Sequence, residues 1–292
     1  MKTKLFTLLS LCLILFSVSC KKKSARVVDT PQQGTITIQA DESFKSVAEA
    51  LTDRYMALYP ETKLELVIKK EDLAFLDLLE RKTRVIIMSR DLTDEEKEAY
   101  KAKIDLDLQP APFAADAAVF VVPKNDTRES ISVDEIKKML TDGSKKMIFD
   151  GTNSSNFNFV AQKLNTKTNQ LQFSIVSGNK NVIEQLNQFP GYIGVVSLNT
   201  LSRPYDPDSE SLRNNVKILK VEDQGKMYEP TLGNLAEMSY PFTRVLYFLT
   251  NEPYFGLGNG FIRFSCTQLG QIVVGKEGLQ PYNIFRREVQ MR

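Results

Sequence analysis

The chain has 292 residues, of which 42% are hydrophobic and 25% are charged, and its formal net charge is +2. This composition fits a globular protein large enough for two lobes, and so small a net charge gives no support for nucleic-acid binding. The sequence has no histidine, which excludes histidine-dependent hydrolases and most zinc enzymes. The only thiols, Cys12, Cys20 and Cys266, lack metal-ligand spacing, so we expect no metal and no cofactor.

The N-terminus has the pattern of an export signal. Lys2 and Lys4 precede an apolar core over residues 5–18, which is too short to span a membrane as a mature helix. Cys20 follows small residues and resembles the cysteine of the bacterial lipoprotein cleavage box, although Ser17 stands where leucine is usual. The alternative is an ordinary secretory signal that is cleaved nearby.

We therefore predict that residues 1–20 form a lipoprotein signal peptide and that Cys20 carries acyl chains. Several acyl chains together anchor a protein stably, here to a membrane on the periplasmic side of the cell envelope. Residues 21–33 are polar and have no periodicity, which predicts a tether. Cys266 is then left without an intramolecular partner, and its apolar neighbours indicate a small buried side chain rather than a reactive thiol.

From Gly34 onward the chain alternates between strand and helix patterns. The apolar spacing predicts strands over 35–39, 64–68 and 85–88, and helices over 44–58 and 72–80. This order of strand, helix, strand, helix and strand is typical of a parallel, doubly wound sheet.

Two loops of this first half carry candidate ligand-binding groups. Ser43 lies at a helix start, where free N–H groups point outward; the alternative, which this loop taken alone favours, is that Asp41 and Ser43 only cap the helix. Ser89 and Arg90 follow the buried strand 85–88, and Thr93 with Glu96 has the spacing of a capping box that opens the next helix. In open α/β sheets, ligands bind at this carboxyl end of the strands.

The same pattern restarts after a second buried strand over 117–122, which Pro123 ends. Ser132 and Glu135 have the spacing of another capping box. The loop Ser154-Ser155-Asn156 precedes a helix and could direct hydroxyl and N–H groups at one anion. The remaining predictions are a strand over 147–149, a helix over 179–189, a strand over 192–196, a loop over 202–211, strands over 216–221 and 243–249, and helical structure with glycine breaks over 257–275.

Over nearly its whole mature length the chain resembles the phosphate-type, PstS-like substrate-binding proteins of ABC importers. These proteins are a branch of the type 2 periplasmic binding protein fold. The order of the matching motifs along the chain is specific, although each motif alone is weak. The motifs are Ala40-Asp41-Glu42-Ser43-Phe44, Ser89-Arg90-Asp91-Leu92-Thr93, Ala115-Asp116-Ala117-Ala118-Val119, Ser154-Ser155-Asn156, Gly191-Tyr192-Ile193-Gly194-Val195, Tyr240-Pro241-Phe242-Thr243-Arg244-Val245-Leu246-Tyr247, Gly256-Leu257-Gly258-Asn259-Gly260-Phe261-Ile262 and Gly270-Gln271-Ile272-Val273.

The resemblance implies an α/β fold of two lobes, each a doubly wound and mostly parallel sheet flanked by helices. We expect residues 34–122 and 239–292 to form lobe I, and residues 123–238 to form lobe II. The strands over 117–122 and 243–249 should lie side by side where the chain crosses between the lobes.

The resemblance also implies a ligand-binding site, although the binding loops depart from the phosphate pattern. The third loop of phosphate binders usually reads Ser-Gly-Thr with an arginine shortly after, whereas here Asn158 stands near the arginine position. Arg90 stands where the best-known members have an aspartate, and could supply the missing positive charge or form a surface ion pair with Asp91 or Asp94. The expected ligand-binding residues are Ser43, Phe44, Ser89, Arg90, Ser154, Ser155 and Asn156.

Two functions of different classes follow. The first is a binding protein that closes on a tetrahedral oxyanion, phosphate by preference, and delivers it to the permease of an ABC importer. The second is a lipid-anchored interaction or scaffold protein that keeps the fold but has lost its small ligand. An enzyme is not expected, because no motif pairs a nucleophile with a base.

Overall fold

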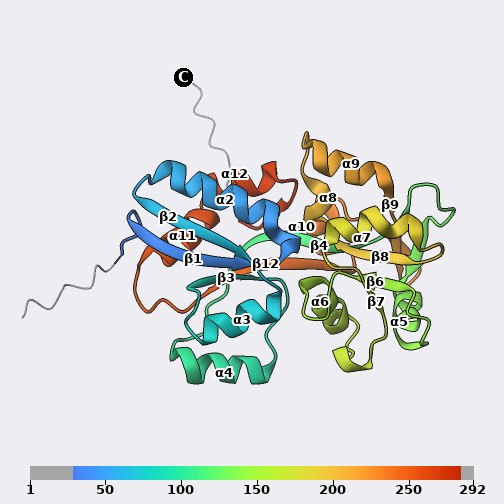
Figure 1. Ribbon diagram of the computed structural model, residues 1–292, viewed down its shortest axis with the longest axis horizontal. Coiled ribbons are helices and arrows are strands. Elements are labelled where there is room, and N and C mark those ends of the chain that lie inside the picture. Colours follow the sequence, from blue (N-terminus) through green and yellow to red (C-terminus); the bar gives the residue numbers. More distant parts are fainter. Residues whose placement is uncertain (1–28, 284–292) are drawn as a thin grey trace, which may run out of the picture.

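One continuous sheet of ten strands runs through both halves of the molecule (Figure 1). The structure is a computed structural model that describes residues 29–283. Eight strands follow one another across the sheet, and β13 (Gln280–Pro281) and β9 (Val216–Ile218) pair with β4 in addition. In spatial order the eight are β2 (Thr62–Ile68), β1 (Gly34–Ala40), β3 (Val85–Met88), β12 (Thr243–Thr250), β4 (Ala111–Pro123), β8 (Ile193–Ser197), β6 (Met147–Phe149) and β7 (Ser174–Ile175).

Parallel strands form both ends of this sheet, and two antiparallel strands cross its middle. β1 pairs in parallel with β2 and β3, and β6 pairs in parallel with β8 and β7. The first part of β4 pairs with β12, from Ala111 opposite Phe248 to Ala117 opposite Thr243, and its later part pairs with β8. β4 and β12 therefore belong to both halves and are the strands on which the chain crosses between the lobes.

Helices cover both faces of the sheet (Figure 1). In lobe I, α2, α11 and α12 pack on one face and α3 and α4 on the other, since alternate side chains of β3 enter two different cores. The helices of lobe I are α2 (Lys45–Leu58), α3 (Glu71–Leu79), α4 (Asp94–Ile104), α11 (Leu257–Cys266) and α12 (Gln268–Lys276), after the short 3₁₀ helix η1 (Glu42–Phe44).

Lobe II has its own core around β8 and β6. A separate three-stranded sheet completes it, with the order β11 (Lys226–Tyr228), β10 (Lys220–Asp223) and β5 (Ser130–Ser132). The helices of lobe II are α5 (Val133–Thr141), α6 (Ser155–Lys163), α7 (Asn179–Gln185), α8 (Asn199–Ser202), α9 (Pro207–Asn215) and α10 (Leu232–Ala236), with 3₁₀ turns η2 (Thr168–Gln170) and η3 (Leu186–Gln188).

The C-terminal helices belong to the core of the N-terminal half. Phe261 and Phe264 of α11 and Val274 of α12 pack with residues of β1 and α2. Tyr55 of α2 meets Phe261 edge-on at a centroid distance of 5.7 Å. The chain therefore returns to its first lobe after β12.

Several predicted elements differ from the structure in instructive ways. The predicted loop over 202–211 is wrong in its second half, where α9 begins with Asp206 as its N-cap and proline at its first position. The predicted strand over 216–221 divides at Leu219, because β9 pairs with β4 while β10 pairs with β5. The helical C-terminal segment breaks at the extended Thr267 rather than at a glycine. The helix predicted over 179–189 ends at Gln185 and continues as the turn η3.

Local signals placed other elements correctly. The capping box of Thr93 and Glu96 is present in full at the start of α4. At Ser132 the hydroxyl accepts a hydrogen bond from the N–H of Glu135, as the second capping box predicts. β3 spans the four residues predicted for it, Val85–Met88.

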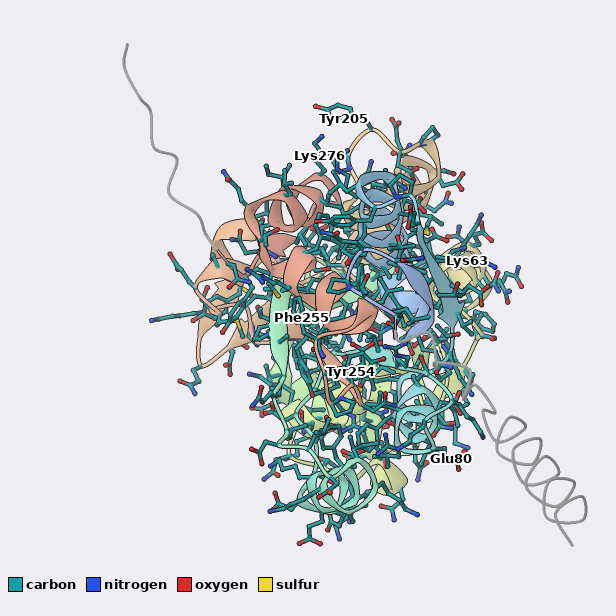
Figure 2. All side chains as sticks on the ribbon, turned by 90° about the vertical axis from the view of Figure 1, so that its left-hand side faces the viewer. Lys63, Glu80, Tyr205, Tyr254, Phe255 and Lys276 are labelled. Carbon is teal, nitrogen blue, oxygen red and sulfur yellow. The ribbon has the colours of Figure 1, made fainter. Side chains whose placement is uncertain are left out.

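The predicted signal peptide 1–20, the acylation site Cys20 and residues 21–28 of the tether lie outside the described residues. The end of the tether is bound to lobe I rather than free. The carboxylate of Asp29 accepts hydrogen bonds from Arg84, from the hydroxyl of Tyr254 at 2.6 Å and from the N–H of Leu257 at 2.9 Å. Figure 2 views the molecule from this end, with Tyr254 and Phe255 in the foreground. In the part from 29 to 283, no helix is both long enough and apolar enough to cross a membrane.

Candidate functional site

Three loops direct backbone N–H groups at one fully buried carboxylate, that of Asp41. Its Oδ1 accepts a hydrogen bond from the N–H of Ser43 at 3.0 Å, and its Oδ2 accepts from Glu71 and Ser155 at 3.2 Å each. Asp41 comes directly after β1, Glu71 begins α3, and Ser155 begins α6 of lobe II. The first N–H groups of a helix have no partner within the helix and carry the positive end of its dipole, so these three loops together form a cradle for an oxyanion.

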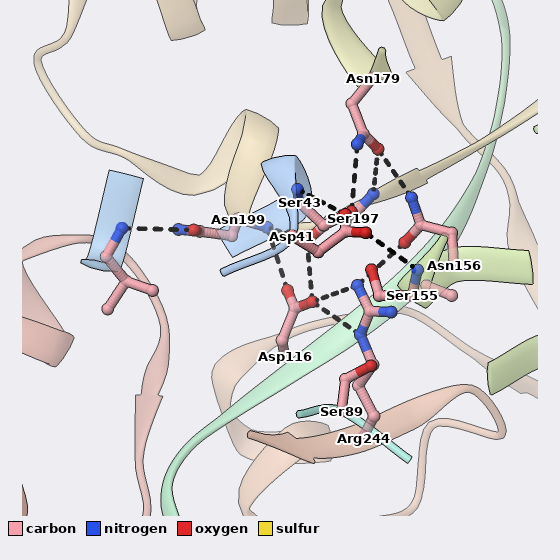
Figure 3. Close-up of polar contacts among 12 residues, drawn as sticks. Asp41, Ser43, Ser89, Asp116, Ser155, Asn156, Asn179, Ser197, Asn199 and Arg244 are labelled. Atoms are coloured by element: carbon pink, nitrogen blue, oxygen red, sulfur yellow. Dashed lines mark hydrogen bonds and ion pairs between the residues drawn. The ribbon is translucent and has the colours of Figure 1, made fainter. Parts of the chain in front are cut away.

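Around this cradle, a hydrogen-bond network connects the lobes (Figure 3). The amide nitrogen of Asn179 donates to the hydroxyl of Ser43 at 3.1 Å, and its oxygen accepts from Asn156 at 2.8 Å and from the N–H of Ser197 at 3.0 Å. Ser43 belongs to lobe I, whereas the other three belong to lobe II, so the network holds the lobes closed.

An ion pair of Lys70 and Asp150 also spans the lobes, with 2.6 Å between Nζ and Oδ2. Burial, together with the nearby Asp41, raises the pKa of Asp150. Burial lowers the pKa of Lys70, but Asp150, Asp41 and Glu42 together outweigh that effect and the pKa rises. The charge of Lys70 is thus engaged by Asp150, next to the cradle.

Glu71 places a second carboxyl group beside the cradle. Its Oε2 accepts hydrogen bonds from the N–H of Ser89 at 2.9 Å and from the Ser89 hydroxyl at 2.7 Å. Burial raises the pKa of Glu71 to about 7, although Arg90 and Ser89 act in the opposite direction. The loop after β3 therefore holds Glu71, and among residues 29–283 the hydrogen bonds to Asp41 come from elsewhere.

Arg90 is engaged by acidic side chains of lobe I. Its guanidinium contacts Glu96 at 2.7 Å and Asp72 at 2.9 Å, and its Nε lies 3.4 Å from Glu71. The alternative of a surface ion pair with Asp91 or Asp94 is wrong in its partners and in its exposure, since the Arg90 side chain is 7% exposed. It folds back over the N-terminus of α4, where the capping-box carboxylate of Glu96 lies.

Arg244 belongs to the network drawn in Figure 3, and sequence reasoning did not single it out. It donates from Nε and Nη2 to one oxygen of Asp116, at 2.9 and 2.7 Å, and from Nη2 to Asn156 at 2.9 Å. Its guanidinium also lies over the rings of Phe44 and Phe159. Arg244 on β12 and Asp116 on β4 thus fix the two crossing strands against each other.

The structure brings some of the predicted site residues together and separates others. Ser43, Ser155 and Asn156 line the cradle or its network, and Phe44 packs under Arg244. Ser154 caps α6 by accepting from the N–H of Phe157. Ser89 and Arg90 form the neighbouring Glu71 cluster. Sequence reasoning considered Asp41 only as a cap. It missed Glu71, Asp150, Asn179 and Arg244.

Buried polar atoms without a hydrogen-bond partner among residues 29–283 include Oε1 of Glu71, the hydroxyl of Ser155 and Nη1 of Arg244. In Figure 3 this third nitrogen of Arg244 points away from Asp116. Buried polar groups without partners are uncommon, so these atoms are available to a ligand or to water. No group of three or more acidic or cysteine side chains in the described part of the chain is arranged to hold a metal ion.

A model of the PBP superfamily domain matches residues 27–268. The chain belongs to the PBP superfamily. Among curated protein sequences, none matches this superfamily member significantly.

Solved structures of the same fold include named phosphate binders. A protein from Clostridium perfringens that carries the name of a phosphate ABC transporter substrate-binding protein, with bound phosphate, has a TM-score of 0.69 and 22% identity, covering 85% of this chain and 99% of its own. An ABC-type phosphate transport receptor from Vibrio cholerae has a TM-score of 0.64 and 17% identity, with 85% and 100% covered. PstS from Borrelia burgdorferi has a TM-score of 0.55 and 22% identity, with 85% and 99% covered. At these identities the likeness concerns the two-lobed α/β fold.

Proposed function

We propose that this PBP superfamily member is an extracytoplasmic solute-binding protein that closes its two lobes on a tetrahedral oxyanion, with phosphate as the preferred ligand. The observation that carries the proposal is the cradle of three N–H groups, from Ser43 and Glu71 of lobe I and from Ser155 of lobe II, directed at one carboxylate position. A carboxylate and a phosphate both present oxygens with negative charge, and both are stabilised by helix N-termini.

The side chains next to the cradle add donors of the right kind. The hydroxyl of Ser155 and Nη1 of Arg244 are buried without partners among the described residues. A hydroxyl can both donate and accept, so Ser155 suits a phosphate that still carries a proton. Donors from both lobes would make anion binding and lobe closure one event.

The wider role rests on the fold and on the sequence pattern. The named neighbours are phosphate-binding components of ABC transporters, which supports delivery of the ligand to a permease in the membrane. The N-terminal pattern supports an anchor of acyl chains on Cys20, on the periplasmic side of the cell envelope. Asp29, nine positions after Cys20, is bound to lobe I, so a short tether would keep that lobe near the membrane.

A second candidate function is a lipid-anchored interaction or scaffold protein without a small ligand. Two observations favour it: the carboxylate in the cradle belongs to the chain itself, and Arg90 is already engaged by Glu71, Asp72 and Glu96. A phosphate would also enter a region where the carboxyl groups of Glu71 and Asp150 oppose its charge.

Calorimetry on the full-length protein in detergent micelles distinguishes the two functions. We expect one phosphate per chain with a micromolar or smaller Kd, and Ser155→Ala should weaken binding by about threefold to tenfold, since one neutral hydrogen bond is lost. Ser144→Ala, at an exposed position of lobe II, is the matched control and should bind like the wild type. A folded wild-type protein that binds neither phosphate nor sulfate would favour the scaffold.

A further inference from the structure

We propose that Asp41 is the residue that sets anion affinity and specificity in this chain, because its carboxylate is a built-in occupant of the oxyanion cradle. A free anion has to displace this side chain to reach the N–H groups of Ser43, Glu71 and Ser155. The inference rests on the proposed function, since it concerns the same cradle.

The hydrogen bonds of Asp41 are those of an internal ligand rather than those of an ordinary helix cap. A cap needs only the N–H groups of the helix that it begins, and Asp41 does accept the N–H of Ser43 in η1. The other two donors lie 30 and 114 residues further along the chain, in α3 and α6. One carboxylate thus takes the donors of both lobes that an external oxyanion would need.

The surrounding acidic side chains also favour an anion that replaces the Asp41 carboxylate over one that binds beside it. Glu71 and Asp150 are buried beside Asp41, and the cation Lys70 is held by Asp150. Glu42 next to it is half-buried, and burial raises its pKa. A doubly charged phosphate added to this group of acids would meet repulsion, whereas a phosphate that replaces the Asp41 carboxylate would meet less.

The backbone at position 41 does not itself require an aspartate. Asp41 has an extended backbone, with φ −65° and ψ 150°, which glycine, serine and asparagine can all adopt. Its side chain therefore acts on the cradle and is not required by the backbone. Because Asp41 also joins lobe I to Ser155 of lobe II, it should hold the lobes closed in the absence of an anion.

The test compares phosphate binding by the full-length wild type with that by Asp41→Gly and Asp41→Asn, by calorimetry at fixed ionic strength. We expect Asp41→Gly to bind phosphate at least tenfold more tightly than the wild type, since an anion then takes charge-assisted hydrogen bonds that the carboxylate held. Asp41→Asn keeps the bulk but removes the charge, so its gain should be smaller. Asp107→Gly, at an exposed loop position, is the matched control and should bind as the wild type does.

The outcomes separate this inference from the proposed function. If Asp41→Gly binds phosphate tightly and the wild type does not bind it, Asp41 is the built-in occupant of the cradle. The proposed function of the natural chain is then wrong. Binding by the wild type with no gain in folded Asp41→Gly overturns the inference alone. If neither protein binds phosphate while circular dichroism reports both as folded, the inference and the proposed function are both wrong.

Discussion

The buried pair of Arg244 and Asp116, which joins the crossing strands β12 and β4, should be the ion pair on which the stability of the fold depends most. Both side chains are fully buried, and two hydrogen bonds of 2.9 and 2.7 Å join them. Arg244→Met keeps most of the volume but leaves the carboxylate of Asp116 without its cation. Asp116 retains only the hydroxyl of Ser197 and the N–H of Asn199, at 2.8 and 3.0 Å. Removal of one partner of such a pair costs about 3–5 kcal/mol of unfolding free energy.

Urea unfolding followed by circular dichroism measures this loss. The control is Lys220→Met, which breaks a pair with Glu229 of similar length, 2.7 Å, whose side chains are about half exposed. Such a pair contributes less than about 1 kcal/mol, because water screens it. The double variant Arg244→Met with Asp116→Leu should recover much of the loss, since no unpaired charge then remains buried. A loss in Arg244→Met no larger than in the Lys220 control would refute the reasoning.

Three further predictions concern other parts of the chain. Cys20→Ser should move the protein from the membrane fraction to the soluble periplasmic fraction, and unchanged membrane association would contradict the lipoprotein interpretation. Burial raises the pKa of Glu71 from 4.5 to about 7, so its contribution to stability is complete below pH 4.5 and is lost as pH rises through 7. The unfolding free energy of the wild type, measured with urea at a series of pH values, should therefore fall by about 3 kcal/mol between these limits, and that of Glu71→Gln should not show this fall. The same pH dependence in both proteins would show that Glu71 does not titrate in this range. Burial raises the pKa of the Cys266 thiol to about 11. Iodoacetamide at pH 8 should therefore alkylate Cys266 at least tenfold more slowly in the folded protein than in the unfolded chain, as measured by mass spectrometry. Equal rates would mean that the thiol is accessible and ionised.

Much of the architecture could be predicted from the sequence because its signals are local. The apolar run of Val85–Met88 and the capping box at Thr93 depend on residues a few positions apart, and both are present in the structure. α9 could also have been predicted, because Asp206 followed by proline is a start signal, but the surrounding loop-like composition concealed it. The ordered series of motifs then indicated the two-lobed fold.

The candidate site was only partly predictable, because its contacts join distant segments. The sequence identified Asp41 as a cap, and it does cap η1. In the sequence, an aspartate before a helix looks the same whether it only caps that helix or also accepts hydrogen bonds from two other helices. Only the tertiary structure, in which the loops after β1, β2 and β6 meet between the lobes, places Glu71 and Ser155 around the same carboxylate.

Arg90 illustrates the same division. Its position after β3 follows from the sequence, and a guanidinium at a strand end is a reasonable anion ligand. Its partners were decided by the packing of α3 and α4, which bring Asp72 and Glu96 within hydrogen-bond distance. The sequence by itself determined which segments become strands, helices and loops, whereas only the tertiary structure determined which charges meet, because Coulomb and hydrogen-bond energies depend on distances that the fold sets across the chain.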